Sequence, residues 1–168
     1  MIDNPRHPVR KKIRLDRELY ADPGTIISLT LATQGRRPAF AEPQIVGGCR
    51  DVLAQTADNH QMNVIVYCFM PDHLHVLLEN SNGSDLITFM KQFKSWSTRI
   101  AWKHGIDGKL WQRSYHDHVL RENEDIAGHI RYILSNPVRH DLVRFWNEYP
   151  WAGSFVYDFS DPVDWPTK

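Results

Sequence analysis

The sequence predicts an α+β fold in which a single antiparallel sheet carries helices packed on one face, as in the ferredoxin-like and RRM-like split βαβ plan. Short β-branched or apolar runs of strand length alternate with longer segments whose apolar residues recur at helical spacing. Two of the apolar runs are separated only by the turn sequence PDH at 71–73, which predicts a hairpin and hence an antiparallel pair. The expected order is strand, helix, strand, strand, helix, strand, helix.

The N-terminal half supplies the first strand, a helix and the hairpin. Residues 25–34 are β-branched and alternate in polarity, which is typical of a strand with one buried face. Residues 42–57 predict a helix with Pro43 in its first turn, where a missing N–H is tolerated, although two adjacent glycines weaken it. The next two apolar runs make the hairpin at 62–79.

The C-terminal half carries two amphipathic segments and a short strand. Ser84 and Asn123 have the side-chain oxygen that a helix N-cap needs. Pro137 is expected to end the last helix, because the residue before a proline is disfavoured in helical conformation. We therefore expect helices at 85–105 and 123–136 and a strand at about 115–121.

Length and composition suit one domain spanning residues 1–168. Cys49 and Cys68 lie in apolar segments, which is typical of buried thiols in a reducing cytosol and not of a disulfide framework. Without a signal-peptide pattern or a membrane-length apolar stretch, we expect a cytoplasmic protein with no membrane partner. Basic and acidic residues balance at 20 each, so only local basic runs argue for phosphate binding.

Two histidines stand two residues apart in the second hairpin strand, within FMPDHLHVLLEN. Alternate residues of a strand share one face about 6–7 Å apart, so His73 and His75 present two imidazoles side by side while Leu74 faces away. Neutral imidazole binds divalent ions, which makes the pair a candidate metal site. Two partly buried histidines on an amphipathic strand are the alternative, and the motif alone leaves both open.

A second pair, His116 and His118, lies in a segment that is polar on both faces, and an exposed edge strand explains it without a metal. The last helix adds further donors. His129, Tyr132 and Asn136 are three and four residues apart and therefore share one helix face, which could lie over the first histidine pair. Taken singly, Tyr132 fits a core tyrosine and Asn136 fits a turn residue before proline.

Three segments in this order, MPDHLHVLLE, LWQRSYHDHVLR and HIRYILSNPVRHDLV, resemble the HUH-type single-tyrosine transposases. The resemblance is strongest to the REP-associated tyrosine transposase branch of these insertion-sequence-like transposases. The stretch SLTLATQGRRPAF also resembles the first strand and Arg-rich turn of that family. The resemblance covers residues 10–155, which we take as the core of a single HUH transposase-like domain; the three motifs are specific jointly and weak singly.

The resemblance implies a role for several residues. The two HUH histidines fall on His73 and His75, which would bind Mg²⁺ or Mn²⁺, and the nucleophilic tyrosine falls on Tyr132. The polar ligand one turn later falls on Asn136, where insertion-sequence relatives carry glutamine, so the amide oxygen is kept with a shorter reach. His129 is the fallback third ligand.

The implied activity is cleavage and rejoining of single-stranded DNA near hairpins through a 5′-phosphotyrosine. Tyr115 is a rival nucleophile, and exposed aromatics could stack unpaired bases, with core packing as the alternative for Trp96 and Trp102. The family expectation is a homodimer, although a domain of this size can also act as a monomer. The basic residues expected to bind DNA are Arg10, Lys11, Lys12, Arg36, Arg37, Lys91, Lys94, Arg99, Lys103 and Arg113.

Two other functions fit the residues. A non-catalytic RRM-like module that binds single-stranded nucleic acid needs aromatics on an open sheet face, where this sequence places histidines. A metal-dependent phosphoesterase would use the histidine pair to activate water and would not need Tyr132.

Overall fold

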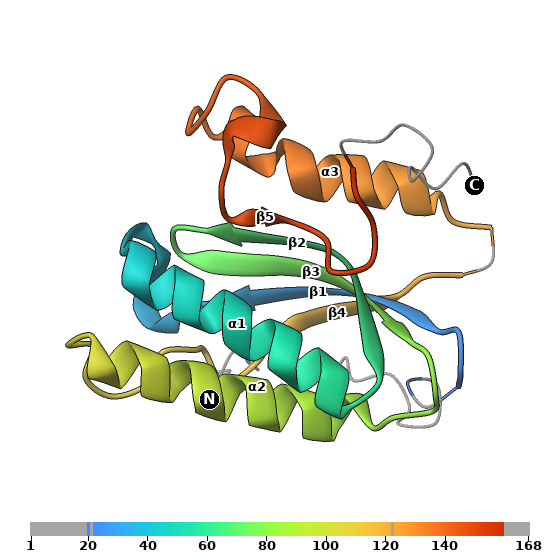
Figure 1. The fold of residues 1–168 in the computed structure, drawn as a ribbon, viewed down its shortest axis with the longest axis horizontal. Coiled ribbons are helices and arrows are strands. Elements are labelled where there is room, and N and C mark those ends of the chain that lie inside the picture. The colour runs from blue at the N-terminus through green and yellow to red at the C-terminus, as the bar shows by residue number, and fades with distance from the viewer. Residues whose placement is uncertain (1–19, 21, 122, 160–168) are drawn as a thin grey trace, which may run out of the picture.

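The computed structural model describes residues 20, 22–121 and 123–159, and its elements follow the expected order (Figure 1). The strands are β1 (Ile26–Ala32), β2 (Met62–Met70), β3 (His73–Asn80), β4 (His116–Val119) and β5 (Ala152–Gly153). The helices are α1 (Pro43–Asn59), α2 (Leu86–Lys103) and α3 (Ile126–Arg139), and a short 3-10 helix, η4 (Trp146–Glu148), follows α3.

The sheet is antiparallel throughout and has the spatial order β4-β1-β3-β2-β5. The first four strands have the order of the split βαβ plan, with α1 and α2 as the connecting helices, so the predicted α+β class is confirmed. The β2–β3 hairpin turns at residues 71–72, as the sequence predicts. β3 lies at the centre of the sheet, paired on both sides.

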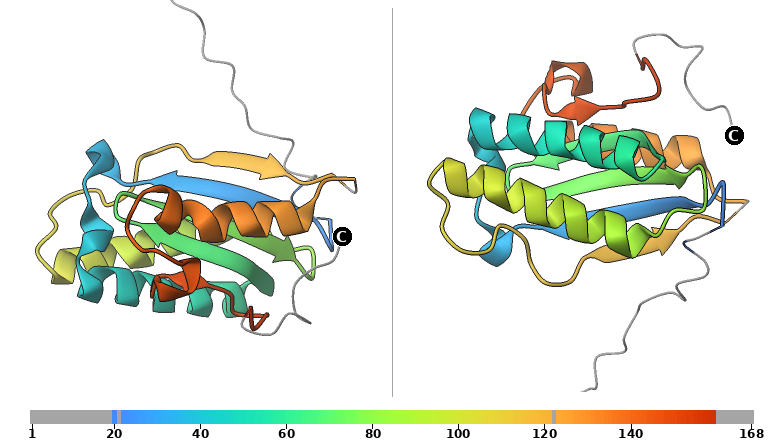
Figure 2. Two further views of the ribbon diagram at one scale, coloured as in Figure 1. Left: turned by 90° about the horizontal axis from the view of Figure 1, so that it is seen from above. Right: turned by 60° about the horizontal axis from the view of Figure 1, so that its bottom comes forward.

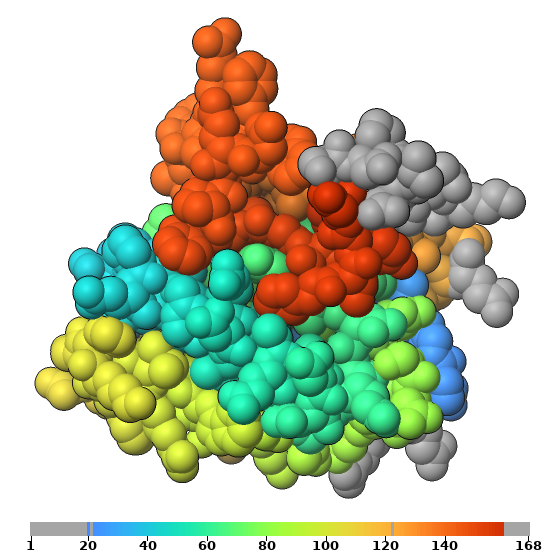
Figure 3. Space-filling view, viewed as in Figure 1, coloured from blue at the N-terminus to red at the C-terminus, as the bar shows by residue number. Residues whose placement is uncertain are grey.

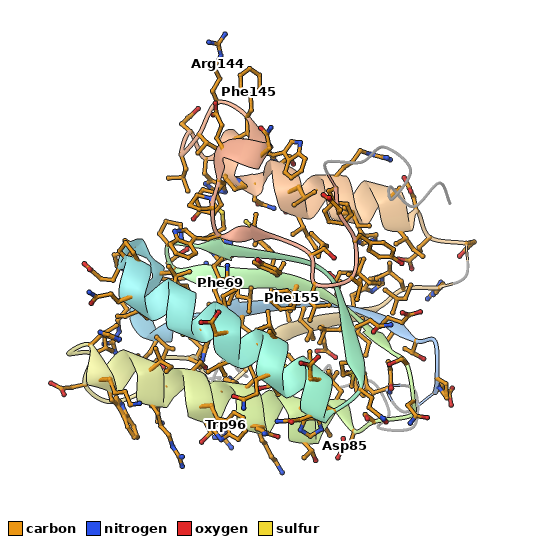
Figure 4. All side chains as sticks on the ribbon, in the orientation of Figure 1. Phe69, Asp85, Trp96, Arg144, Phe145 and Phe155 are labelled. Carbon is orange, nitrogen blue, oxygen red and sulfur yellow. The ribbon has the colours of Figure 1, made fainter. Side chains whose placement is uncertain are left out.

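The face of the sheet toward α1 and α2 forms the larger core. Alternate strand residues such as Leu29 and Leu74 point into it and meet Leu53 of α1 and Phe89 of α2. Figure 2 shows α1 and α2 side by side across this face, and Figure 4 shows Phe69 between the sheet and α1. These two helices lie on one face, as expected.

The third helix departs from the prediction that all helices pack on one face. α3 lies on the opposite face, where Ile130 and Ile133 pack against Val66, Cys68 and Leu77 (Figure 1). The physical reason is the composition of β2, in which every residue except Asn63 is buried. A strand that is apolar on both faces must be covered on both faces, and α3 supplies the second cover.

The predicted helix ends also need correction. Asp125 caps α3 by accepting a bond from the N–H of Gly128 at 2.8 Å, and Asp85 caps α2 by accepting from Ile87 at 3.0 Å. The expected caps, Ser84 and Asn123, lie one and two residues too early. Asp supplies the same acceptor oxygen, together with a negative charge that is favourable at a helix N-terminus.

Pro137 does not end α3, which continues to Arg139. Proline removes the N–H that would bond to the carbonyl of Ile133. The side-chain amide of Asn136 compensates, because its Nδ2 donates to the Tyr132 carbonyl at 2.8 Å and to the Ile133 carbonyl at 3.4 Å. The side-chain amide of Asn136 therefore helps α3 to continue past Pro137 to Arg139.

Beyond α3 the chain projects from the body of the protein, with Arg144 and Phe145 at the tip (Figures 3 and 4), and returns as β5. The two cysteines are buried and free as predicted, Cys49 in the α1/α2 core and Cys68 under α3, and burial raises the pKa of each thiol to about 12. Within the described part of the chain, the helices fall short of the length and apolarity needed to cross a bilayer.

The two glycines of α1 have different surroundings. A Cβ added to Gly48 would lie 2.6 Å from Cγ2 of Ile100 in α2, whereas one added to Gly47 would approach Trp151 no closer than 3.8 Å. We expect Gly48→Ala to lower the free energy of unfolding by about 1–3 kcal/mol through overpacking. Gly47→Ala is the matched control and should raise it by about 0.5–1 kcal/mol. Urea unfolding measures both, and equal effects would contradict the close approach of α1 to α2 at Gly48.

Asn136→Ala tests the compensation at Pro137. We expect it to lower the free energy of unfolding by about 1–3 kcal/mol, because the buried carbonyl of Ile133, which receives no N–H from Pro137, loses its side-chain donor. In a Pro137→Ala background the restored backbone N–H can serve Ile133, so the same substitution should have a smaller effect. Urea unfolding in the presence of a chelator measures stability apart from any ligand, and an equal loss in the two backgrounds would contradict this role of Asn136.

Candidate active site

The two histidines of the hairpin lie on the α3 face at the centre of the sheet. His73 is the first residue of β3, and Leu74 between the two histidines is fully buried in the α1/α2 core. The strand register places Thr30 of β1 opposite His75. The predicted common face of His73 and His75 is therefore present.

The imidazoles converge through their Nε2 atoms, which lie 3.0 Å apart. Each Nδ1 has a separate partner: that of His73 lies 2.5 Å from Oδ1 of Asp72, and that of His75 lies 2.9 Å from Oγ1 of Thr30. Arg36 holds the other oxygen of Asp72 at 3.3 Å. Contacts of this kind at the distal nitrogen fix ring orientation in histidine ligands of metals.

Electrostatics keep His75 in the neutral form that can bind a cation. Burial, followed by the charges of His73, His140 and Arg36, lowers the pKa of His75 to about 4, so His75 is neutral near pH 7. Burial raises the pKa of Asp72, but its hydrogen bond to His73 and the charges of His73 and Arg36 outweigh burial and lower the pKa overall. An ionised Asp72 only accepts, so Nδ1 of His73 carries the proton and Nε2 keeps its lone pair when the ring is neutral.

Tyr132 approaches the pair from α3. Its ring meets His75 edge-to-face, with 6.1 Å between the centroids and 77° between the planes. The side chain is 50% exposed, which leaves it accessible to a substrate. The guanidinium of Arg139, two turns further along α3, lies 5.0 Å from the centre of the Tyr132 ring. Strand and helix thus bring a tyrosine, two imidazoles and an arginine together.

The other two α3 residues are placed differently. Asn136 is buried and its amide nitrogen is committed to the helix, so only Oδ1 could serve as a metal donor. His129 stacks on His118 of β4, with 6.2 Å between the ring centroids, and its Nε2 lies 3.7 Å from Glu124. The structure therefore places the fallback ligand beside an edge-strand histidine. Among residues 20, 22–121 and 123–159, no group of three His, Cys, Asp or Glu is arranged to hold a metal ion.

The strand β4 carries the second histidine pair and is an edge strand, as expected, with both His116 and His118 exposed. Tyr115, just before it, packs against the α1/α2 core, and the ammonium of Lys94 lies 5.8 Å from its ring. Tyr115 is thus on the opposite side of the sheet from His73 and His75. Only Tyr132 of the two candidate nucleophiles meets the histidine pair.

The basic residues expected to bind DNA separate into groups. Arg36 contacts the site through Asp72, and it adopts φ +56°, a left-handed conformation that non-glycine residues rarely take. Nζ of Lys94 instead bonds the carbonyl of Gln112 at 2.6 Å, and burial lowers its pKa to about 8. The face of the sheet opposite the histidines is covered by α2, which carries Lys91, Arg99 and Lys103. The segment 108–113 after α2 includes Arg113, and its Lys109 carbonyl accepts a bond from Arg37. Arg10, Lys11 and Lys12 lie outside the described residues.

Sequence reasoning missed four residues around the site: Thr30, Asp72, Arg139 and His140. Asp72 was detectable in principle, since it directly precedes His73 and a carboxylate beside a histidine often orients the ring. Thr30 is visible only through the strand register, and Arg139 and His140 only once α3 is known to continue past Pro137.

Comparison with known proteins gives a consistent result. Residues 24–136 match the family model described as "Transposase IS200 like". The chain is 26% identical over 156 residues to a Haemophilus influenzae protein named "Putative REP-associated tyrosine transposase", covering 84% of this chain and 88% of the relative. It is 23% identical over 119 residues to the REP-associated tyrosine transposase of Escherichia coli, covering 69% and 70%.

The fold has a counterpart among solved structures. A REP-associated tyrosine transposase bound to a REP hairpin superposes with a TM-score of 0.69 and 22% identity, over 89% of both chains. At this identity the likeness concerns the fold, while the family assignment rests on the match over 24–136. The chain belongs to the IS200-like transposase family, a family of DNA-processing enzymes.

Proposed function

We propose that this protein cleaves and rejoins single-stranded DNA beside hairpins, forming a 5′-phosphotyrosine at Tyr132 with a divalent ion held by His73 and His75. The main support is the arrangement of β3 and α3. The Nε2 atoms of His73 and His75 converge to 3.0 Å, and the half-exposed ring of Tyr132 lies against His75. Membership of a transposase family supports the class of chemistry. The REP hairpin bound by the structurally similar protein supports a hairpin-bearing substrate.

The spacing of the two histidine donors is compatible with a divalent ion such as Mg²⁺ or Mn²⁺. Adjacent ligands in an octahedral sphere with bonds of about 2.1 Å lie about 3 Å apart, which agrees with the 3.0 Å between the two Nε2 atoms. Both Nδ1 atoms are already occupied, so Nε2 is the donor in each ring. The amide oxygen of Asn136 is the proposed third donor. When bound, the ion would polarise the scissile phosphate and neutralise part of its charge.

The protein side chains account for the covalent step. Oη of Tyr132 attacks the phosphorus and loses its proton, the bond to the 3′ oxygen of the preceding nucleotide breaks, and that oxygen takes a proton to become a free 3′-OH. Arg139 lies beside Tyr132 and Arg36 beside Asp72, so a phosphate bound between Tyr132 and the histidine pair would have two guanidinium groups near it. The reverse attack by a 3′-OH rejoins the strand without a nucleotide cofactor.

The two alternative functions have less support. An RRM-like module binds through an open sheet face, and here α3 covers part of that face. A phosphoesterase would leave Tyr132 without a role, although its half-exposed ring is placed against His75. Both alternatives give distinct outcomes in the following experiment.

The nucleophile can be tested with a hairpin oligonucleotide that carries single-stranded flanks, incubated with Mn²⁺ and analysed on a denaturing gel. We expect a covalent protein–DNA adduct that Tyr132→Phe abolishes and Tyr115→Phe retains, because only Tyr132 meets the histidine pair. An adduct that survives Tyr132→Phe would refute the assignment. Cleavage without any adduct would favour the phosphoesterase, and binding without cleavage would favour the module.

The orienting role of Asp72 predicts a change in metal affinity. Removing such a partner of a histidine ligand typically weakens binding by about 10–100-fold, and we expect this for Asp72→Ala, with adduct formation recovering at saturating Mn²⁺. Electron paramagnetic resonance of free Mn²⁺ measures the affinity directly. Asp51→Ala is the control, since Asp51 is exposed and its carboxylate bonds the neighbouring Arg50 on α1. Equal Mn²⁺ affinity of the two variants would contradict the role of Asp72.

A further inference from the structure

A second candidate site lies away from the histidine pair, between the C-terminal half of α2 and the segment 108–113. It is a cavity of about 420 Å³. Leu110 and Trp111, both buried, contribute an apolar floor, and Trp102 of α2 contributes a wall. This volume is within the range of small-molecule and cofactor pockets.

Trp102 is the unusual member of this cavity, because 56% of its surface is exposed. Trp96, one and a half turns earlier on α2, packs against the core, so core packing explains Trp96 and not Trp102. Nε1 of Trp102 donates to the carbonyl of Gly108 at 2.6 Å, which satisfies its polar group and fixes the ring. A fixed, exposed indole can stack on a planar ligand with little loss of conformational entropy.

The charge of the cavity favours an anionic ligand. Lys109 and Arg113 line it and are exposed, and none of the described residues that line it is acidic. Lys94 also lines it, but its ammonium is bonded to the carbonyls of Gln112 and Arg113, where it anchors the segment. The apolar floor and the indole of Trp102 suit the base of a nucleotide, and the exposed cations of Lys109 and Arg113 suit its phosphate.

Backbone contacts connect this cavity to the active site. The N–H of Gln34 donates to the carbonyl of Leu110 at 2.7 Å, and Nη2 of Arg37 donates to the carbonyl of Lys109 at 3.1 Å. Arg36, which directly precedes Arg37, bonds Asp72, and Asp72 in turn bonds His73. The turn at 34–37 therefore contacts both the segment that lines the cavity and the aspartate that orients His73.

We propose that this cavity binds one unpaired nucleotide of the DNA substrate, with its base stacked on Trp102 and its phosphates contacted by Lys109 and Arg113. The proposal rests on the proposed function, because it assigns a subsite for the same DNA. It extends that function by assigning a second DNA-binding site, separate from His73, His75 and Tyr132, that recognises a single-stranded flank.

The test is equilibrium binding of a fluorescent hairpin oligonucleotide with single-stranded flanks, measured by anisotropy in the presence of a chelator so that no cleavage occurs. Stacking on an aromatic is typically worth about 5- to 150-fold in affinity. We expect Trp102→Ala to weaken binding by about tenfold or more and Trp102→Phe to retain most of the affinity. Phe145→Ala is the control, since Phe145 is equally exposed (55%) at the tip beyond α3 and should have no such effect.

Abasic substitution locates the nucleotide. In the wild-type protein, removing the base at one flank position should reproduce the loss caused by Trp102→Ala, and in that variant the same position should have no further effect. A second variant, Lys109→Ala with Arg113→Ala, should reduce the slope of log affinity against log salt by about 1.4, which is 0.7 for each phosphate contact on a single strand. Thermal unfolding verifies that each variant is folded.

The outcomes separate this inference from the proposed function. The proposed nucleotide site is wrong if Trp102→Ala binds the oligonucleotide with wild-type affinity. It is also wrong if the effect of each abasic position is the same in the wild-type protein and in Trp102→Ala. Adduct formation at saturating DNA and Mn²⁺ is measured on the same variants, and an adduct in Trp102→Ala leaves the function intact whatever the binding result. Absence of both binding and adduct in the wild-type protein overturns both.

Discussion

The alternation of β3 is the constraint on which the rest of the structure depends. Because β3 is paired on both sides, each of its side chains is committed to one face: Leu74 and Val76 enter the α1/α2 core, and His73 and His75 face α3. A register shift of one residue would bury both imidazoles among apolar side chains. The contact of Thr30 with His75 across the sheet belongs to this register alone. The apolar pattern that stabilises the sheet therefore also positions the candidate ligands.

Among the described residues, α3 covers only part of the sheet face that carries His73 and His75, which leaves the candidate site accessible to a substrate. α3 packs through Ile130 and Ile133 on the doubly apolar strand β2, while the polar side chains of β3 and β4 remain beside it. Tyr132 lies at the border of the apolar contact, which explains its half exposure. Continuation of α3 beyond Pro137 matters here, because only a helical path brings Arg139 over the Tyr132 ring.

Sequence patterns predicted the elements whose periodicity extends over many residues, including the hairpin, α1, α2 and the antiparallel split βαβ order. An amphipathic pattern shows that a helix buries one side but not which face of a sheet it covers, so the position of α3 could not be deduced from α3 itself. The signal lay in β2, whose apolar run requires cover on both faces. The pairing of His73 with His75 follows from a period of two, and helical spacing grouped Tyr132 with His129 and Asn136, but its role as nucleophile came only from the resemblance. Their meeting depends on tertiary packing that links residues more than fifty positions apart, and Asn136 stays a predicted ligand.

The distribution of charge adds a geometric condition on substrate binding. The basic residues of α2 lie on one side of the sheet, whereas His73, His75 and Tyr132 lie on the other. The sheet and its apolar core separate the two sides, so a DNA strand that contacted both would have to pass around the sheet, and one such path runs past the end of β1. At that end the turn at 34–37 bonds the 109–110 backbone in one direction and Asp72 in the other. The left-handed conformation of Arg36 is consistent with a backbone constrained by these contacts. This turn therefore links the backbone at 109–110 to Asp72 and the histidine pair, and it would connect the proposed nucleotide site to the proposed chemistry at Tyr132.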